Sequence, residues 1–382
     1  MKPAIVVVTY NRPASLNRLL TFLSNSVFDS SDINLVISID YQSSPMHDEV
    51  VKIANKFYWK YGFKKIIEHQ NNLGLKTHVL SCGDLSVEYG AVIVLEDDIA
   101  VSPYFYNYAV QSLEAYDEDK NIAGISLYAF EWSTVASRPF IPVENGYDVY
   151  FFQNAQSWGQ VWSKRMWQEF KEWYSTHKNQ EININLPDNV RSWSEKSWLK
   201  YHIWYCVDKN KYFVYPYVSL STNNSDAGVH LKGDLTYFQV PLLMGKRVRH
   251  FMPKFNENSC KYDVYFERQG LEIFLDIENN DLCIDLYGKK KNREKKRYWL
   301  TSSVENYKLI KSFALELRPH ELNVVFSISG SEIFLYDTHT VIKNEMKKNN
   351  LEAKITLYDI KEIPSKKLIE VLKYRLFKKM KI

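Results

Sequence analysis

The chain has 382 residues, of which 45% are hydrophobic, and its formal charge is +4 at neutral pH. This length and composition suit two globular domains with packed cores, which excludes a disordered protein. The modest charge argues against a nucleic-acid partner, and no run of about 18 apolar residues predicts a membrane span. The four cysteines are scattered, with no CxxC pair and no zinc-site spacing, so we expect free thiols and a cytoplasmic protein.

The N-terminal part alternates short apolar strands with amphipathic helices, a pattern typical of an α/β fold with a mainly parallel sheet flanked by helices. The strand before residue 96 is entirely apolar, as expected of a central strand that is buried on both faces. In chain order, we expect strands at 4–9, 35–40, 65–69 and 91–95, and helices at 13–23, 48–61 and 75–89.

Three consecutive acids, Glu96, Asp97 and Asp98, follow the fourth expected strand directly. Asn11 and Asp40 follow two other expected strands, and the carboxyl ends of parallel strands meet at one edge of a sheet. Adjacent carboxylates repel one another unless a cation compensates them, and Mn²⁺ and Mg²⁺ prefer oxygen ligands. The triplet therefore predicts a site for one of these metals, whereas the simpler alternative is a solvated acidic loop.

Four segments resemble successive motifs of GT-A-fold, Rossmann-like nucleotide-sugar glycosyltransferases, in particular the N-acetylglucosaminyltransferase I type and bacterial family 2-like relatives. The resemblance covers roughly residues 1 to 240 and rests on the spacing of all four motifs. In this family the acidic triplet is the metal-binding DXD-type motif, followed by a hydrophobic residue and an aromatic-rich helix. The segments are IVVVTYNRP, LVISIDYQS, VIVLEDDIAVSPYFYNY and FFQNAQSWGQVWSKRMW.

The resemblance implies a role for each acid near the donor. Asp98 matches the metal ligand, while Glu96 and Asp97 match the groups that hydrogen-bond the donor sugar and the ribose. Asp40 matches the acid that pairs with the nucleotide base, although it could equally be a turn residue. The implied cofactor is Mn²⁺ or Mg²⁺.

Other matched positions would line the donor site. Thr9, Asn11 and Arg12 match the loop that encloses the base, with Arg12 near the diphosphate or, alternatively, flanking a helix. Gly74 matches a turn whose backbone approaches the nucleotide. Trp158 and Gly159 match the wall of the donor-sugar and acceptor pocket, whereas Trp162 and Trp167 are interpreted as the core of a helix.

An inverting transfer also requires a carboxylate that takes the proton of the acceptor hydroxyl. The segment VRSWSEKSWLKYHIW resembles the Trp-flanked acidic segment that carries this base, and its acid is Glu195. Many relatives have Asp in this segment, so a Glu must reach about one methylene further. Asp188 is the second candidate, and a third alternative is that neither residue is the base.

The segment STNNSDAGVHLKG, residues 221 to 233, is rich in small and polar residues and resembles a mobile loop over the donor. His230 is its candidate metal or diphosphate ligand, with Asp226 a weaker one. Beyond residue 250 the pattern changes to strands and turns, which predicts a catalytic domain at 1–250 and a smaller α+β appendage at 251–382. A basic run, 289–297, is interpreted as a solvated loop.

The last segment, 365–382, predicts a basic amphipathic helix. Leu368, Leu372 and Leu376 recur every four residues, and seven Lys or Arg residues face the single acid Glu370. One interpretation is peripheral attachment to an anionic membrane at its inner face, where a lipid-linked acceptor would be found. The alternative is packing or oligomerisation through the same apolar stripe.

Together these features predict a metal-dependent, inverting hexosyl- or N-acetylhexosaminyltransferase that moves a sugar from a nucleoside diphosphate donor to a saccharide acceptor. UDP is favoured by the resemblance, and bacterial surface polysaccharide synthesis is the expected setting. The alternatives are a nucleotidyltransferase, against which the lack of a Gly-rich phosphate loop argues, and a non-catalytic sugar-binding or scaffold protein.

Overall fold

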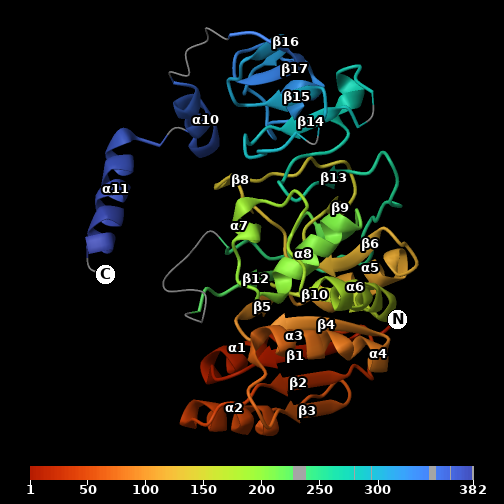
Figure 1. The fold of residues 1–382 in the computed structure, drawn as a ribbon. Helices are drawn as coiled ribbons and strands as arrows, with labels where there is room; N and C mark the ends of the chain where they lie inside the picture. The colour runs from red at the N-terminus through yellow and green to blue at the C-terminus, as the bar shows by residue number, and fades with distance from the viewer. Residues whose placement is uncertain (227–237, 279, 294, 344–349, 362, 381–382) are drawn as a thin grey trace. The chain divides into compact units, whose positions relative to one another are not determined.

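A computed structural model describes residues 1–226, 238–278, 280–293, 295–343, 350–361 and 363–380 (Figure 1). The chain forms two compact units, Met1–Gly270 and Leu271–Ile382. Residues 251–270 belong to the first unit because strand β13 (Lys261–Tyr262) pairs with β9 (Val149–Phe152) of its main sheet. The boundary therefore lies after Gly270, later than the boundary expected at residue 250.

Within the described part of the first unit, nine strands form one mixed, mainly parallel sheet in the order β13-β9-β11-β6-β10-β4-β1-β2-β3. Strands β4, β1, β2 and β3 are all parallel, and β10 runs antiparallel between β4 and β6. The predicted α/β fold class is confirmed. The remaining strands are β1 (Ala4–Thr9), β2 (Leu35–Ile39), β3 (Lys64–Glu68), β4 (Ala91–Glu96), β6 (Ile122–Ser126), β10 (Gln160–Ser163) and β11 (Tyr212–Pro216).

Helices flank this sheet (Figure 1). Helix α1 packs against α2, while α3 and α6 pack against α8. Right-handed crossovers put α1 and α2 on one face and α3 on the other, because the strand order reverses direction between β1 and β4. The helices of this unit are α1 (Pro13–Ser24), α2 (Pro45–Lys56), α3 (Gly74–Asp84), α4 (Ser86–Tyr89), α5 (Phe105–Tyr116), α6 (Lys164–His177), α7 (Asp188–Arg191) and α8 (Trp198–Asp208).

Local hydrogen bonds explain where the elements differ from expectation. Helix α2 begins before residue 48 because the Ser44 hydroxyl accepts the His47 N–H at 3.3 Å as an N-cap. The helix expected at 75–89 divides into α3 and α4, since the Leu85 N–H bonds to the Cys82 carbonyl three residues back. Trp162 was expected in a helix but is buried in β10, whereas Trp167 is buried in α6 as predicted.

Helix α3 is held against α6 at its C-terminal end. A Cβ atom at Gly83 would overlap the Trp167 ring, so the ring lies directly against the backbone of α3. The Trp167 Nε1–H donates to Asp84 Oδ1 at 2.8 Å. Gly83 and Asp84 together fix the position of α3 on α6.

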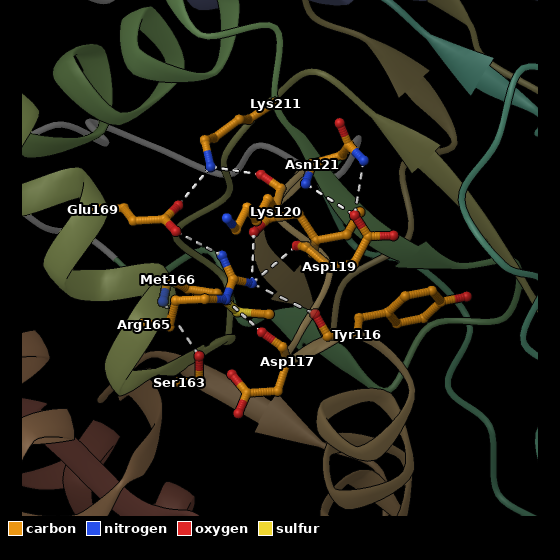
Figure 2. Close-up of polar contacts among 11 residues, drawn as sticks. Tyr116, Asp117, Asp119, Lys120, Asn121, Ser163, Arg165, Met166, Glu169 and Lys211 are labelled. Atoms are coloured by element: carbon orange, nitrogen blue, oxygen red, sulfur yellow. Dashed lines mark hydrogen bonds and ion pairs between the residues drawn. The ribbon is translucent and has the colours of Figure 1, made fainter.

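Arg165 joins the end of α5, strand β6 and helix α6 (Figure 2). Its guanidinium donates to the carbonyls of Asp119 at 3.0 Å and Ile122 at 3.2 Å, and it pairs with Glu169 at 3.1 Å. Lys211 contacts the other oxygen of Glu169 at 2.5 Å. These groups satisfy one another, so the cluster is structural.

The second unit contains a four-stranded sheet in the order β14-β15-β17-β16 among its described residues. Leu300, Phe313 and Leu335 are part of its apolar core. Among the strands and turns expected beyond residue 250, two segments form helical turns, namely 271–274 and 322–325. Its elements are η1 (Leu271–Phe274), β14 (Leu282–Asp285), β15 (Tyr298–Thr301), β16 (Tyr307–Phe313), α9 (Leu322–Val325), β17 (Ile333–Val341), α10 (Leu351–Ile360) and α11 (Ser365–Met380).

The four cysteines are free and buried, which confirms the expected thiols. None of the helices, as far as the described residues extend, is long and apolar enough to cross a membrane.

A short antiparallel pair, β7 (Trp132–Ser133) and β8 (Arg138–Pro139), lies outside the main sheet.

Candidate active site

The acid triplet lies at the topological switch point of the sheet. Strands β1 and β4 are neighbours, with Val8 opposite Glu96, and the Asp97 N–H donates to the Val8 carbonyl at 3.1 Å. On the other side of β1, the Asp40 N–H donates to the Thr9 carbonyl at 3.0 Å. The ends of three strands thus bring the triplet, Thr9 and Asp40 to one edge, where ligands of open α/β sheets bind.

Arg12, at the start of α1, bridges two acids of the triplet. Its guanidinium pairs with Asp98 Oδ2 at 3.1 Å and with Asp97 Oδ1. The Thr9 hydroxyl donates to the other oxygen of Asp97 at 2.7 Å, and the Asp97 side chain is buried. Arg12, expected near a diphosphate, is therefore a cation that already compensates the triplet.

Burial dominates the electrostatics of the triplet. It raises the pKa of Asp97 to about 6, against the opposing effects of Arg12 and Thr9. Burial, followed by the charges of Asp98 and Asp97, also raises the pKa of Glu96. Burial acts to lower the pKa of Arg12, but the two neighbouring carboxylates raise it, so the guanidinium stays charged. One cation faces three acids, which leaves the cluster able to accept further positive charge.

The free oxygen of Asp98 fits a metal ion. Its Oδ1 atom is buried and has no hydrogen-bond partner among the described residues, which is costly unless a ligand satisfies it. Across the described ranges, no group of three or more His, Cys, Asp or Glu side chains is arranged to hold a metal. A hard cation that takes one protein carboxylate and completes its shell with water and substrate phosphates would satisfy this Asp98 oxygen.

The segment at residues 221–226 lies beside the triplet. Strand β12 (Ser221–Asn223) pairs antiparallel with β5 (Ile99–Val101), which directly follows the triplet. The backbone N–H and the side-chain amide of Asn224 donate to the Asp98 carbonyl at 2.9 and 3.1 Å. The Asp226 carboxylate accepts the Ser15 hydroxyl at 2.7 Å and pairs with Arg18. Both partners lie in α1, so Asp226 ties this segment to that helix. His230 lies outside the described residues.

Asp40 anchors the start of α3. Its carboxylate accepts the N–H groups of Tyr41, Leu73 and Gly74 at 2.9, 2.8 and 3.0 Å, and the residue is only 3% exposed. Gly74 has φ +72°, a conformation that favours glycine. The acid expected to pair with a base thus fixes the backbone turn that was expected to approach the nucleotide.

Asn11 and the loop after β2 border a shallow hollow on the same edge. The Asn11 amide donates to Gln42 Oε1 at 2.6 Å and ties the loops after β1 and β2 together. The hollow measures about 350 Å³, and its wall is polar. Its lining residues are Tyr41, Gln42, Ser43, Ser44, Pro45, His47, Asp48 and Glu68.

Trp158 and Gly159 lie beside β12. The Trp158 carbonyl accepts the Ser221 hydroxyl at 2.5 Å, and its ring contacts Tyr128 and Phe238 with centroids 4.8 and 4.5 Å apart. Gly159 has φ +91°, and a Cβ atom there would lie 3.2 Å from Ser221 Oγ. Glycine therefore permits the close approach of β12 to the start of β10.

Glu195 lies between α7 and α8, with 70% of its side chain exposed. One carboxylate oxygen pairs with Lys200 Nζ at 2.5 Å, and the other accepts the Tyr201 hydroxyl. These two hydrogen bonds, that of Lys200 first, lower the pKa of Glu195. Lys76, in the first turn of α3, donates to the Glu195 carbonyl at 2.8 Å, which ties this segment to the helix that begins at Gly74.

Sequence reasoning missed the contacts that organise this site. Asp188, the second candidate base, is the first residue of α7. Lys200, Tyr201 and Asn224 were not singled out, although the Glu195 segment included the first two. Lys200 and Tyr201 lie five and six residues after Glu195, beyond the three- and four-residue spacings at which side chains of one helix meet, so the sequence carries no signal for these contacts.

No family model and no curated protein matches the chain. Among solved structures, it is similar to the Pyrobaculum calidifontis mannosyltransferase PcManGT in complex with GDP-Man and Mn²⁺, at 9% identity, covering 44% of this chain and 47% of that one, with TM-score 0.32. It is also similar to S. aureus TarS 1–349, at 14% identity, 59% and 61% coverage and TM-score 0.35. To TarS 1–349 in complex with UDP the identity is 16%, covering 56% of this chain and 60% of that one, with TM-score 0.32. The chain spans less than two thirds of the length of each of these structures, and all three likenesses are weak.

Proposed function

We propose that the protein is a metal-dependent, inverting glycosyltransferase that moves a sugar from a nucleoside diphosphate donor to a saccharide hydroxyl. The observation that carries this proposal is the buried, unpartnered Oδ1 of Asp98 in an acid cluster at the switch point of the sheet. A donor diphosphate beside this oxygen would share a hard cation with it. When bound, Mn²⁺ or Mg²⁺ would offset the charge that develops on the leaving diphosphate.

Arg12 and Asp97 would prepare the donor side. Asp97 binds Arg12 through one oxygen and Thr9 through the other, and its expected hydrogen bond from the donor would use a second lone pair of one of these oxygens. Arg12 also contacts Asp98 and is partly exposed, and a diphosphate is a stronger partner for a guanidinium than a single carboxylate. In this proposal Arg12 moves from Asp98 to the diphosphate as the donor binds, while Glu96 contacts the sugar.

Glu195 would act as the general base. As the acceptor oxygen bonds to the anomeric carbon, its proton passes to the Glu195 carboxylate, and the bond from that carbon to the diphosphate oxygen breaks. The nucleoside diphosphate departs with the electron pair, on the face opposite to attack. Lys200 and Tyr201 each contact one oxygen of Glu195, and the acceptor hydroxyl would approach a remaining lone pair of this exposed carboxylate. Asp188 is the alternative base.

The finer assignments follow the resemblance. We favour UDP as the nucleotide, a hexosyl or N-acetylhexosaminyl group as the transferred sugar, and a bacterial surface polysaccharide as the product. A lipid-linked acceptor at the inner face of the cell membrane is the proposed acceptor. The nucleotide and sugar would contact four residues that lie at the same edge of the sheet, namely Asp40, Gly74, Trp158 and Gly159.

Hydrolysis of a panel of UDP-, GDP- and dTDP-sugars with Mn²⁺ tests the proposal, with the intact chain compared with Asp98→Ala. We expect metal-dependent turnover of one donor, lost in Asp98→Ala. Glu88→Gln is the matched control, because Glu88 is an exposed acid that pairs with Lys65 away from the triplet. Failure to turn over any donor would sink the enzyme proposal, and donor binding without turnover would instead favour a sugar-binding protein.

A further inference from the structure

Helix α11 presents an apolar surface that no other described element of its own unit covers. Every described side chain from residue 365 to residue 377 is exposed. Leu372 is 58% exposed and Leu376 55%, although buried leucines are the rule in packed helices. The exposed apolar residues of the helix are Leu368, Ile369, Val371, Leu372, Tyr374, Leu376 and Phe377.

Three leucines of α11 form a stripe along one face, whereas Val371, Tyr374 and Phe377 fall on the other faces of the helix. Leu368, Leu372 and Leu376 are four residues apart and share one face, with Ile369 beside them. On a helical projection, Lys373 and Arg375 fall on the two borders of this stripe. Glu370 is the sole acid between residues 365 and 382, against seven Lys or Arg residues.

This charge pattern favours an anionic lipid surface over a second copy of the chain. Two copies that paired through the stripe would bring their basic borders together, and like charges at an interface oppose association. Anionic headgroups compensate the same charges, while the boundary between headgroups and acyl chains accepts the leucines. With 16 residues, α11 is too short to span a bilayer and suits the plane of its surface.

We propose that α11 binds the surface of an anionic bilayer, lying in the plane of the headgroups with its leucine stripe inserted. The binding needs neither donor nor metal, so it stands or falls independently of the proposed glycosyl transfer. If both proposals hold, the helix brings the enzyme to the surface that displays a lipid-linked acceptor.

Flotation of the full chain with vesicles tests this proposal, using phosphatidylcholine alone and phosphatidylcholine mixed with phosphatidylglycerol. We expect partitioning to be about tenfold or more stronger on the anionic vesicles and to fall at high salt. The double variant Leu372→Asp/Leu376→Asp should lose binding, and neutralising Lys366, Lys367, Lys373 and Arg375 to Gln should weaken it.

The matched control is Leu309→Asp/Ile310→Asp, which makes the same change at two exposed apolar residues of β16 in the same unit. This variant should bind as the intact chain does. Circular dichroism checks that each variant is folded. Equal binding to neutral vesicles, no binding to either kind, or equal loss in the control would overturn the proposal. A dimer in solution that Leu372→Asp/Leu376→Asp dissociates, without vesicle binding, would assign the stripe to a second copy.

Discussion

The acid triplet and the Glu195 segment carry the two halves of the proposed chemistry, and the fold holds them differently. Asp98 is positioned by neighbouring strands and keeps one buried oxygen without a partner in the described structure. Glu195 lies in a short connection, is largely exposed, and has both oxygens engaged. The triplet thus offers a buried oxygen that a ligand would satisfy, whereas Glu195 is open to solvent and would take up a proton while Lys200 and Tyr201 hold its orientation.

The largest expected effect comes from Glu195→Gln, which removes the proposed base and leaves a side chain of the same size. We expect kcat at saturating donor to fall by about 10² to 10⁴, with donor affinity unchanged. The measurement is transfer or hydrolysis of the active donor, with donor affinity from calorimetry. Asp188→Asn is the matched control, and the assignment of the base would be reversed if that variant, rather than Glu195→Gln, lost kcat.

Asp40 links the two regions, because it anchors the start of α3 and Lys76 of that helix contacts the Glu195 segment. Asp40→Asn replaces one charged acceptor oxygen by a donor that faces N–H groups. We expect the free energy of unfolding to fall by about 2 kcal/mol, with faster hydrogen exchange at Leu73 and Gly74. Urea unfolding and exchange measurements check this. Asp84→Asn at the opposite end of α3 is the control, and it should leave exchange at Gly74 unchanged.

Arg12→Gln tests how the charge of Arg12 affects metal binding at the acid triplet. Because the Arg12 guanidinium lies against Oδ2 of Asp98, its positive charge competes electrostatically with a divalent ion at the other oxygen, Oδ1. We expect Mn²⁺ to bind about tenfold more tightly to the variant in the absence of donor, while donor affinity falls. Electron paramagnetic resonance of free Mn²⁺ measures the first effect. Arg18→Gln, which removes the partner of Asp226, is the control, and weaker Mn²⁺ binding in Arg12→Gln would contradict the competition.

A further prediction concerns the pH dependence of stability and helix α8, whose Lys200 and Tyr201 contact Glu195. His202 of α8 is buried, stacked on Phe170 at 4.0 Å, and burial lowers its pKa from 6.5 to about 3. The unfolded chain takes up this proton below pH 6.5 and the folded chain does not until about pH 3. The contribution to stability is therefore complete above pH 6.5 and is lost as the pH falls toward 3.

His202→Phe should flatten this dependence, as measured by thermal unfolding from pH 7 downward. His78 provides the comparison, because burial lowers its pKa to about 4 and it remains in the variant. An unchanged pH profile in His202→Phe would show that α8 does not carry this sensitivity.

Much of the sheet could be predicted because its strands are buried on both faces and read as apolar runs. The strand at residues 4–9 agrees with β1 at both ends, and β4 ends one residue later than expected, at Glu96, the first acid of the triplet. The secondary structure of aromatic segments was harder to predict, because a buried residue such as Trp162 is compatible with a strand or a helix. The segments at 271–274 and 322–325 are too short for the periods of helix and strand to differ.

The edge of the sheet at which the candidate residues meet was predictable, but their contacts with one another were not. Strand ends with polar residues indicate an edge, yet the pairing of Arg12 with Asp97 and Asp98 depends on the register of β1 against β4. The bonds from Lys200 and Tyr201 to Glu195 depend on how the chain enters α8. Such contacts follow from tertiary geometry, and no spacing in the sequence encodes them.

The contact between Gly83 and Trp167 fixes one end of helix α3, and the other end contacts both candidate regions. Its far end rests on an indole ring, and its near end meets Asp40 through Gly74 and Glu195 through Lys76. A side chain added at Gly83 would push the helix along or away from α6, and the rigid turns of α3 would carry that displacement to both candidate regions at once. Activity could thus be tuned from the distant end of one helix, without touching any residue that meets the substrate.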